Sequence, residues 1–127
     1  MRRGRGEDGL TATQLAIVMP VLLFFVMLVV QYGLWFHANQ VASAAAAEAV
    51  DAAQVPHGLG ADGERAARSF LAQSGNLRDV AVEVDHTVDQ VVARVRGRAP
   101  QVVPGIAWSV VAQAQAPVER FVPQPQR

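Results

Sequence analysis

The chain contains no cysteine and no lysine among its 127 residues. Without cysteine, disulfides, thiolate catalysis and cysteine-ligated metal sites are excluded. Export is not excluded, because a disulfide is permitted outside the cytoplasm but not required. The eleven basic residues are all arginines, and eleven acidic residues bring the formal net charge to zero. A broad nucleic-acid-binding surface is therefore not expected.

Residues that carry catalytic chemistry are also scarce. The three histidines have no metal-ligand spacing, and no serine has an adjacent base. The stretch "GLGADG" lacks the Lys-Ser/Thr ending of a phosphate-binding loop and follows no predicted strand. The sequence predicts a protein that is not an enzyme and has no cofactor, metal or small-molecule substrate.

What the chain has in abundance is one apolar run near its N-terminus. "LAIVMPVLLFFVMLVV", from Leu15 to Val30, contains no charge, and "QYGLWF" extends the run to Phe36. As a helix this run is roughly 33 Å long, close to the thickness of a bilayer core. A domain this small could not cover such a helix on all sides. The sequence therefore predicts a transmembrane helix over residues 10–36, preceded by a leader of residues 1–9.

The charges around this run predict its orientation. Three arginines precede it, Arg2, Arg3 and Arg5, and the next arginine is Arg65. The positive-inside rule then places the N-terminus in the cytoplasm and the rest of the chain outside a single-pass cell-membrane anchor. Tyr32, Trp35 and Phe36 are typical of the outer interfacial belt.

A cleaved signal peptide is the competing interpretation. Ala42-Ser43-Ala44 matches an A-x-A cleavage pattern, which would release a secreted domain. However, the apolar run exceeds the usual signal core, and Glu7 and Asp8 weaken a positive leader. The helical pattern also continues through the alanines without a break. We therefore favour one long helix, about Thr11–Gln54, whose Ala-rich extension covers residues 37–54.

The remaining residues, 55–127, predict a small α+β domain. Proline and glycine interrupt the chain at residues 55–63, and a short amphipathic helix follows at about Asp62–Ser74. Its apolar face is Ala66, Ala67, Phe70 and Leu71, and Gly75 is placed to cap its end.

Three stretches then alternate with period two. Residues 80–86 and 91–95 predict an antiparallel hairpin, and the stretch that ends near Pro117 predicts a third strand. Glu83 and Asp85 are expected to face Arg94 and Arg96 on a solvated sheet face. Both helices are expected on the other face of the sheet.

These features together resemble the pilins and pseudopilins of bacterial type IV-like systems. The stretch "GLTATQLAIVMPVLLFFVMLVVQYGLWFHANQVASAAAAEA" is similar to the N-terminal region of TadE-like proteins of the tight-adherence (Flp) pilus apparatus. "GRAPQVVPGIAWSVVAQAQAPVERF" is similar to the C-terminal part of actinobacterial TadE-like proteins, with a "VPG" turn and a "PVERF"-like ending. The resemblance covers residues 9–122.

The resemblance implies a pilin-like pseudopilin that serves as an accessory or minor component of pilus assembly or of a type II secretion-like system. It implies cleavage by prepilin peptidase between Gly9 and Leu10, and packing of the helix in the membrane against other pilin-like proteins. Pro20 stands where the family has its proline. The fifth residue of the mature chain is glutamate in pilins and many TadE-like proteins, whereas here it is Gln14. A signal-anchored exported domain that binds the envelope and is unrelated to pili remains the alternative.

Overall fold

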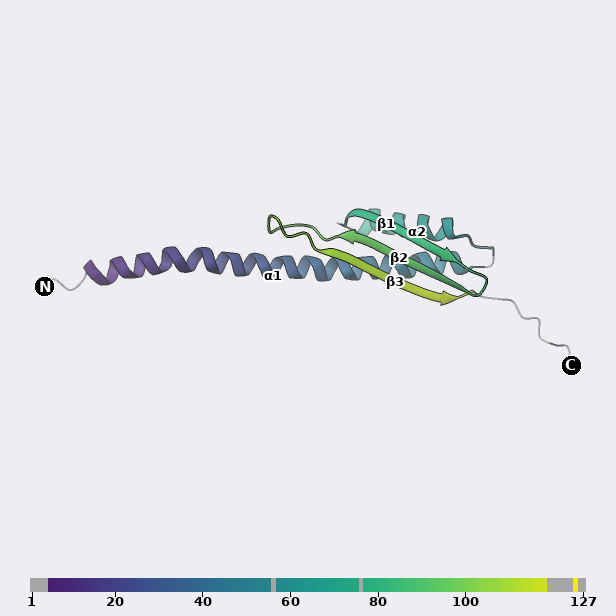
Figure 1. Cartoon of the computed structure of the whole chain (residues 1–127), viewed down its shortest axis with the longest axis horizontal. Helices are drawn as coiled ribbons and strands as arrows, with labels where there is room; N and C mark the ends of the chain where they lie inside the picture. Colours follow the sequence, from purple (N-terminus) through teal and green to yellow (C-terminus); the bar gives the residue numbers. More distant parts are fainter. Residues whose placement is uncertain (1–4, 56, 76, 119–124, 126–127) are drawn as a thin grey trace.

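A computed structural model describes residues 5–55, 57–75, 77–118 and 125. Helix α1 (Arg5–Gln54) is followed by α2 (Gly60–Ser74), β1 (Arg78–His86), β2 (Gln90–Arg98) and β3 (Ser109–Pro117). The first half of α1 projects alone, whereas α2 and the sheet gather on its second half (Figure 1). The predicted α+β fold, with a long apolar N-terminal helix, a short helix and three antiparallel strands, is confirmed.

Helix α1 is longer than the pattern predicted, because it begins at Arg5 instead of near Thr11. Pro20 lies inside it without ending it. A proline has no N–H to donate to the carbonyl four residues earlier, which here belongs to Ala16. The helix continues through the Ala-rich segment to Gln54 with no break at the A-x-A pattern.

The sheet has the strand order β1-β2-β3, and both pairs are antiparallel. The predicted alternation is confirmed, since Val82, Val91, Ala93 and Val95 are buried on one face. At the β1–β2 turn, the Thr87 N–H donates to the carbonyl of Gln90 at 2.9 Å. The expected antiparallel hairpin is therefore present, and its register pairs Val82 with Val95 on the buried face.

The core forms between this face, α2 and the Ala-rich half of α1. Five alanines of α1 have no exposed surface: Ala42, Ala45, Ala46, Ala49 and Ala53. A Cβ added to Gly63 of α2 would lie 2.6 Å from the carbonyl oxygen of Ala49. Small residues on both helices thus permit a close approach, as expected for a small-residue surface with a packed partner. The partner here is the chain's own domain.

Helix α2 begins at Gly60, two residues before the predicted start. The Leu59 N–H donates to the carboxylate of Asp62 at 3.0 Å, which satisfies a backbone donor at the helix start. At the other end the Gly75 N–H donates to the Leu71 carbonyl at 2.9 Å, so the predicted cap is confirmed. Of the predicted apolar face, Ala67 and Leu71 are buried, whereas Ala66 and Phe70 are half-buried.

Of the two acidic residues expected to face arginines across the strands, Glu83 does and Asp85 does not. Glu83 lies opposite Arg94, and their side chains are 3.7 Å apart. Asp85 instead lies opposite Val92, and the β1 residue opposite Arg96 is Ala81. The alternation correctly placed these side chains on one face, but pairing depends on the register between strands, which periodicity alone does not determine.

Candidate functional site

The first half of α1 carries the functional features that the sequence predicts. The helix from Gly9 to Gln54 is long and apolar enough to cross a membrane, and none of its most apolar window is buried. Large apolar side chains project into the surroundings from Leu10 to Val30, with only Met27 and Leu28 half-buried. The core helix of a soluble domain would bury such side chains. The exposed helix is consistent with a membrane anchor.

The residues of the predicted processing and assembly site all lie on this half of α1. Gly9, Leu10, Gln14 and Pro20 are exposed. The peptide between Gly9 and Leu10 is helical, and the Thr13 hydroxyl donates to the Gly9 carbonyl oxygen at 2.9 Å. A Cβ added to Gly9 would meet no atom within 4 Å. These four residues are therefore open to a partner.

Gln31 marks the point at which α1 meets the domain, and its role was missed from the sequence. Its side chain is fully buried. Its Nε2 donates to the Pro100 carbonyl at 3.1 Å, while its Oε1 accepts from the N–H groups of Val102 at 2.8 Å and Val103 at 3.3 Å. Burying an amide without hydrogen-bond partners costs free energy, because the amide loses its bonds to water. These three bonds offset that cost for Gln31. The only sequence signal was a single polar residue in an apolar run.

Trp35 forms a second contact one turn further along α1. Its Nε1 donates to the Ser109 carbonyl at 3.2 Å, and its ring meets Trp108 edge-on with centroids 5.9 Å apart. Tyr32 packs beside Trp35, also at 5.9 Å. Together with Ala107, these residues line an open hollow of about 450 Å³. The predicted belt residues Tyr32 and Trp35 thus lie where the connection between β2 and β3 packs on α1.

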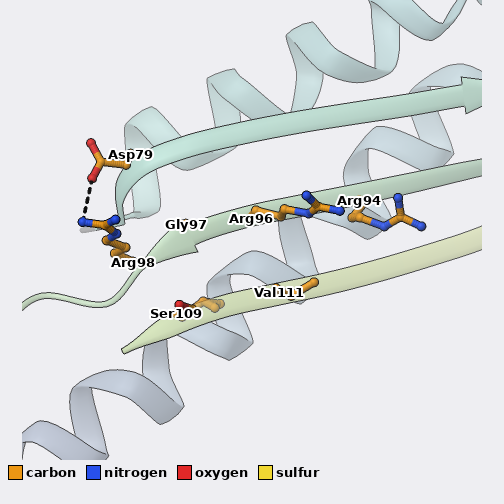
Figure 2. Close-up of a pocket in the computed structure, with 8 residues that line it drawn as sticks. Asp79, Arg94, Arg96, Gly97, Arg98, Ser109 and Val111 are labelled. Atoms are coloured by element: carbon orange, nitrogen blue, oxygen red, sulfur yellow. Dashed lines mark ion pairs between the residues drawn. The ribbon is translucent and has the colours of Figure 1, made fainter. Parts of the chain in front are cut away.

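The outer face of the sheet carries a row of arginines from β2, Arg94, Arg96 and Arg98, beside a shallow hollow of about 470 Å³ (Figure 2). Arg98 pairs with Asp79 at 3.6 Å. Asp79 has a φ of 52° and lies where the β1–β2 register shifts, so a bulge aims its carboxylate at Arg98. Both side chains of this pair are well exposed. The row is a solvated surface, as the charge pattern indicated.

The side chains that could bind a metal ion are dispersed over the described residues. Among them, no group of three or more histidine, aspartate or glutamate side chains is placed to hold a metal ion. His37, His57 and His86 lie far apart in the chain, on α1, in the α1–α2 connection and at the end of β1.

The family model described as TadE-like protein matches residues 9–51. No curated protein and no solved structure matches this chain. The match begins at Gly9 and ends within α1, three residues before the helix ends. The similarity of the C-terminal part lies outside the matched range, and its "PVERF" ending extends into residues 119–121, outside the described residues.

Proposed function

We propose, from the match of residues 9–51 to the TadE-like family model, that the chain is a pseudopilin that acts as an accessory or minor component of tight-adherence pilus assembly. The family is associated with assembly of Tad pili and is generally without catalysis. The observation that carries the proposal is that the matched residues form one helix whose first half is apolar and exposed. Such a helix can contact lipid and the helices of other pilin-like proteins.

We assign the first half of α1 to the membrane, with the N-terminus in the cytoplasm. The apolar, exposed stretch from Leu10 to Val30 supports a span of roughly 30 Å. The arginines of the leader support the orientation; of these, Arg2 and Arg3 lie outside the described residues. In this arrangement residues 1–9 face the cytoplasm and the domain of residues 55–127 lies outside the membrane.

Cleavage by prepilin peptidase between Gly9 and Leu10 is the processing step of this proposal. The family match begins at Gly9, which supports this position. The absence of a side chain at Gly9 lets a peptidase backbone approach closely. Because the Gly9 carbonyl accepts from Thr13 within the helix, the part of α1 around Gly9 must open for the bond to be attacked.

A retained anchor also agrees with the packing of the A-x-A stretch. Ala42 is fully buried against the domain. Cleavage after Ala44 would remove Ala42 together with the contacts that Gln31 and Trp35 make to the β2–β3 connection. The domain would lose part of its core and both of these contacts.

Intact-mass spectrometry of the membrane-extracted chain, expressed with and without a prepilin peptidase, tests the proposal. Loss of residues 1–9 that depends on the peptidase supports it. Replacing Gly9 by phenylalanine should abolish this cleavage, whereas Gly6→Phe in the same leader should leave it intact. A mature chain that begins near Ala45 would show a secreted domain. An uncleaved wild-type chain would favour the signal-anchored envelope-binding domain.

Gln14 permits a test of the assembly role. A glutamate in a membrane would offset its desolvation only by pairing with a charge such as a neighbouring subunit's N-terminal ammonium. Gln14 can hydrogen-bond but carries no charge. If this missing charge limits assembly, Gln14→Glu should increase processing or crosslinking to pilin subunits, and Gln40→Glu, outside the predicted span, should not. An unchanged yield for Gln14→Glu would show that position 14 does not limit assembly.

A further inference from the structure

The connection between β2 and β3, residues 99–108, differs in composition from the rest of the domain surface. No charged residue occurs from Ala99 to the end of β3. Its tip is a turn in which Gly105 has a φ of 82° and the Ile106 N–H donates to the Val103 carbonyl at 3.4 Å. Proline at the second position and a left-handed glycine at the third define a type II turn. The connection is therefore an uncharged segment with a defined turn at its tip, and we call it the 99–108 loop.

The 99–108 loop is the part of the domain that reaches furthest toward the N-terminal half of α1 (Figure 1). The hydrogen bonds of Gln31 hold its backbone beside α1 at Pro100, Val102 and Val103. Gln31 immediately follows Val30, and beyond Val30 the exposed large apolar side chains of α1 are Tyr32 and Phe36 alone among the described residues. If that stretch crosses the hydrocarbon core, the 99–108 loop lies at the level of the outer membrane interface.

The aromatic residues at this level support contact with lipid. Tyr32, Trp35 and Trp108 cluster where α1 meets the 99–108 loop, and they line an open hollow of about 450 Å³. Tyrosine and tryptophan rings are enriched at the membrane–water interface, because they combine an apolar body with a polar atom. Trp108 places one of these rings on the domain itself, so the belt is not confined to α1.

We propose that the 99–108 loop contacts the outer interface of the bilayer and gives the domain a second membrane contact besides α1. Val102, whose side chain is exposed, and Ile106 flank the turn that would meet the lipid. With two contacts the domain has a fixed orientation on the membrane surface. The proposal rests on the membrane anchoring of α1 in the proposed function, but not on pilus assembly.

The position of the 99–108 loop favours lipid, and not a second protein, as what its surface contacts. The loop lies beside the end of the exposed apolar helix, so a spanning α1 places lipid headgroups next to it whether or not a second protein is present. The opposite end of the sheet, at the β1–β2 turn, carries Asp89 and lies away from the apolar half of α1 (Figure 1). The two ends of the sheet therefore provide a matched pair of test positions.

Spin-label accessibility tests the proposal, and the absence of native cysteine makes every label unambiguous. Val102→Cys and Ile106→Cys report on the loop, Val88→Cys on the opposite turn, and Leu23→Cys on the middle of the apolar stretch. Each variant of the full chain is labelled with a nitroxide and reconstituted at low density in phosphatidylcholine–phosphatidylglycerol vesicles. Power saturation then measures how often each label collides with oxygen, which partitions into lipid, and with a water-soluble nickel chelate. The ratio of the two collision rates shows whether the label lies in lipid or in water.

The loop labels should be several-fold less accessible to the nickel chelate than the Val88 label, with an oxygen-to-nickel ratio between those of Val88 and Leu23. Loop labels as accessible to nickel as the Val88 label would overturn the proposal while leaving the anchor intact, provided that the Leu23 label is in lipid. A Leu23 label in water would instead refute the anchoring of α1. Protection of the loop that disappears on dilution of the protein in lipid would show that a second copy, and not lipid, covers it.

Discussion

Replacing Gln31 by leucine should release the 99–108 loop from α1 while leaving the sheet intact. Leucine has nearly the size of glutamine but cannot hydrogen-bond. The change deprives the Pro100 carbonyl and the N–H groups of Val102 and Val103 of their common partner. Leucine cannot satisfy these backbone groups, so the native position of the loop loses stability.

The magnitude follows from the number and burial of these bonds. A buried polar group left without its partner costs about 1–3 kcal/mol. Here the bond to Val103 is buried, whereas the bonds to Pro100 and Val102 are part-buried, so water can reach part of the exposed backbone. We therefore expect the free energy of local loop opening to fall by about 2 kcal/mol, which is less than the roughly 3 kcal/mol or more that three fully buried groups would give.

Amide hydrogen exchange of the full chain in lipid nanodiscs measures this opening directly. A loss of about 2 kcal/mol corresponds to roughly thirty-fold faster exchange at Val102 and Val103, if both amides exchange through local opening. Exchange at the centre of β2, such as Val95, should not change. Gln40→Leu is the matched control, because Gln40 is an exposed glutamine on the same helix.

Two results would refute this reasoning. Unchanged exchange at Val102 and Val103 in the Gln31→Leu variant would mean that the contacts of Trp35 alone hold the loop. Equal acceleration in Gln31→Leu and Gln40→Leu would mean that the added apolar surface, not the lost hydrogen bonds, causes the change.

Two further predictions concern the domain itself. Gly63→Ala should lower the free energy of unfolding by roughly 1–3 kcal/mol, because the new methyl group would lie 2.6 Å from the Ala49 carbonyl oxygen. Gly33→Ala, where no atom lies within 4 Å, should leave the thermal midpoint in detergent unchanged or slightly raised, and equal losses in both variants would contradict the packing argument. Glu83→Gln should lower the free energy of unfolding, measured by chemical denaturation, by less than about 1 kcal/mol, because Glu83 is well exposed and Arg94 is only half-buried. A much larger loss of unfolding free energy would show that this pair contributes more to stability than an exposed ion pair does.

Local patterns in the sequence were sufficient to predict the architecture. The uncharged apolar run predicted the exposed half of α1, and the alternating valines predicted the faces of β1 and β2. These features depend on residues only a few positions apart in the chain. The spacing of apolar residues, 3.6 in a helix and 2 in a strand, is therefore enough to predict them. The family pattern likewise lies within α1, so the resemblance was visible without any tertiary contact.

Features that depend on distant parts of the chain could not be predicted. Gln31 is buried because a loop about 70 residues later folds back on it, and nothing in its neighbourhood records that contact. The bulge at Asp79 shifts the β1–β2 register and creates the pair with Arg98, which the alternation did not suggest. The expectation that Asp85 also faces an arginine failed for the same reason, since strand register is a property of two strands together.

The composition of α1 explains how one helix serves two environments. From Leu15 to Val30 its side chains are mostly large, apolar and exposed, which suits the proposed contact with lipid. From Ala38 to Ala53 the buried positions are mostly alanine, which lets α2 and the sheet approach the helix axis closely. Gln31 and Trp35 lie between these segments, and both are polar enough to bind backbone groups of the domain. Because α1 runs from the proposed anchor into the core as one unbroken helix, a force or rotation applied in the membrane would reach the domain without a flexible linker. Substitutions of Gln31 and Trp35 should therefore uncouple movement of the apolar half of α1 from movement of the domain.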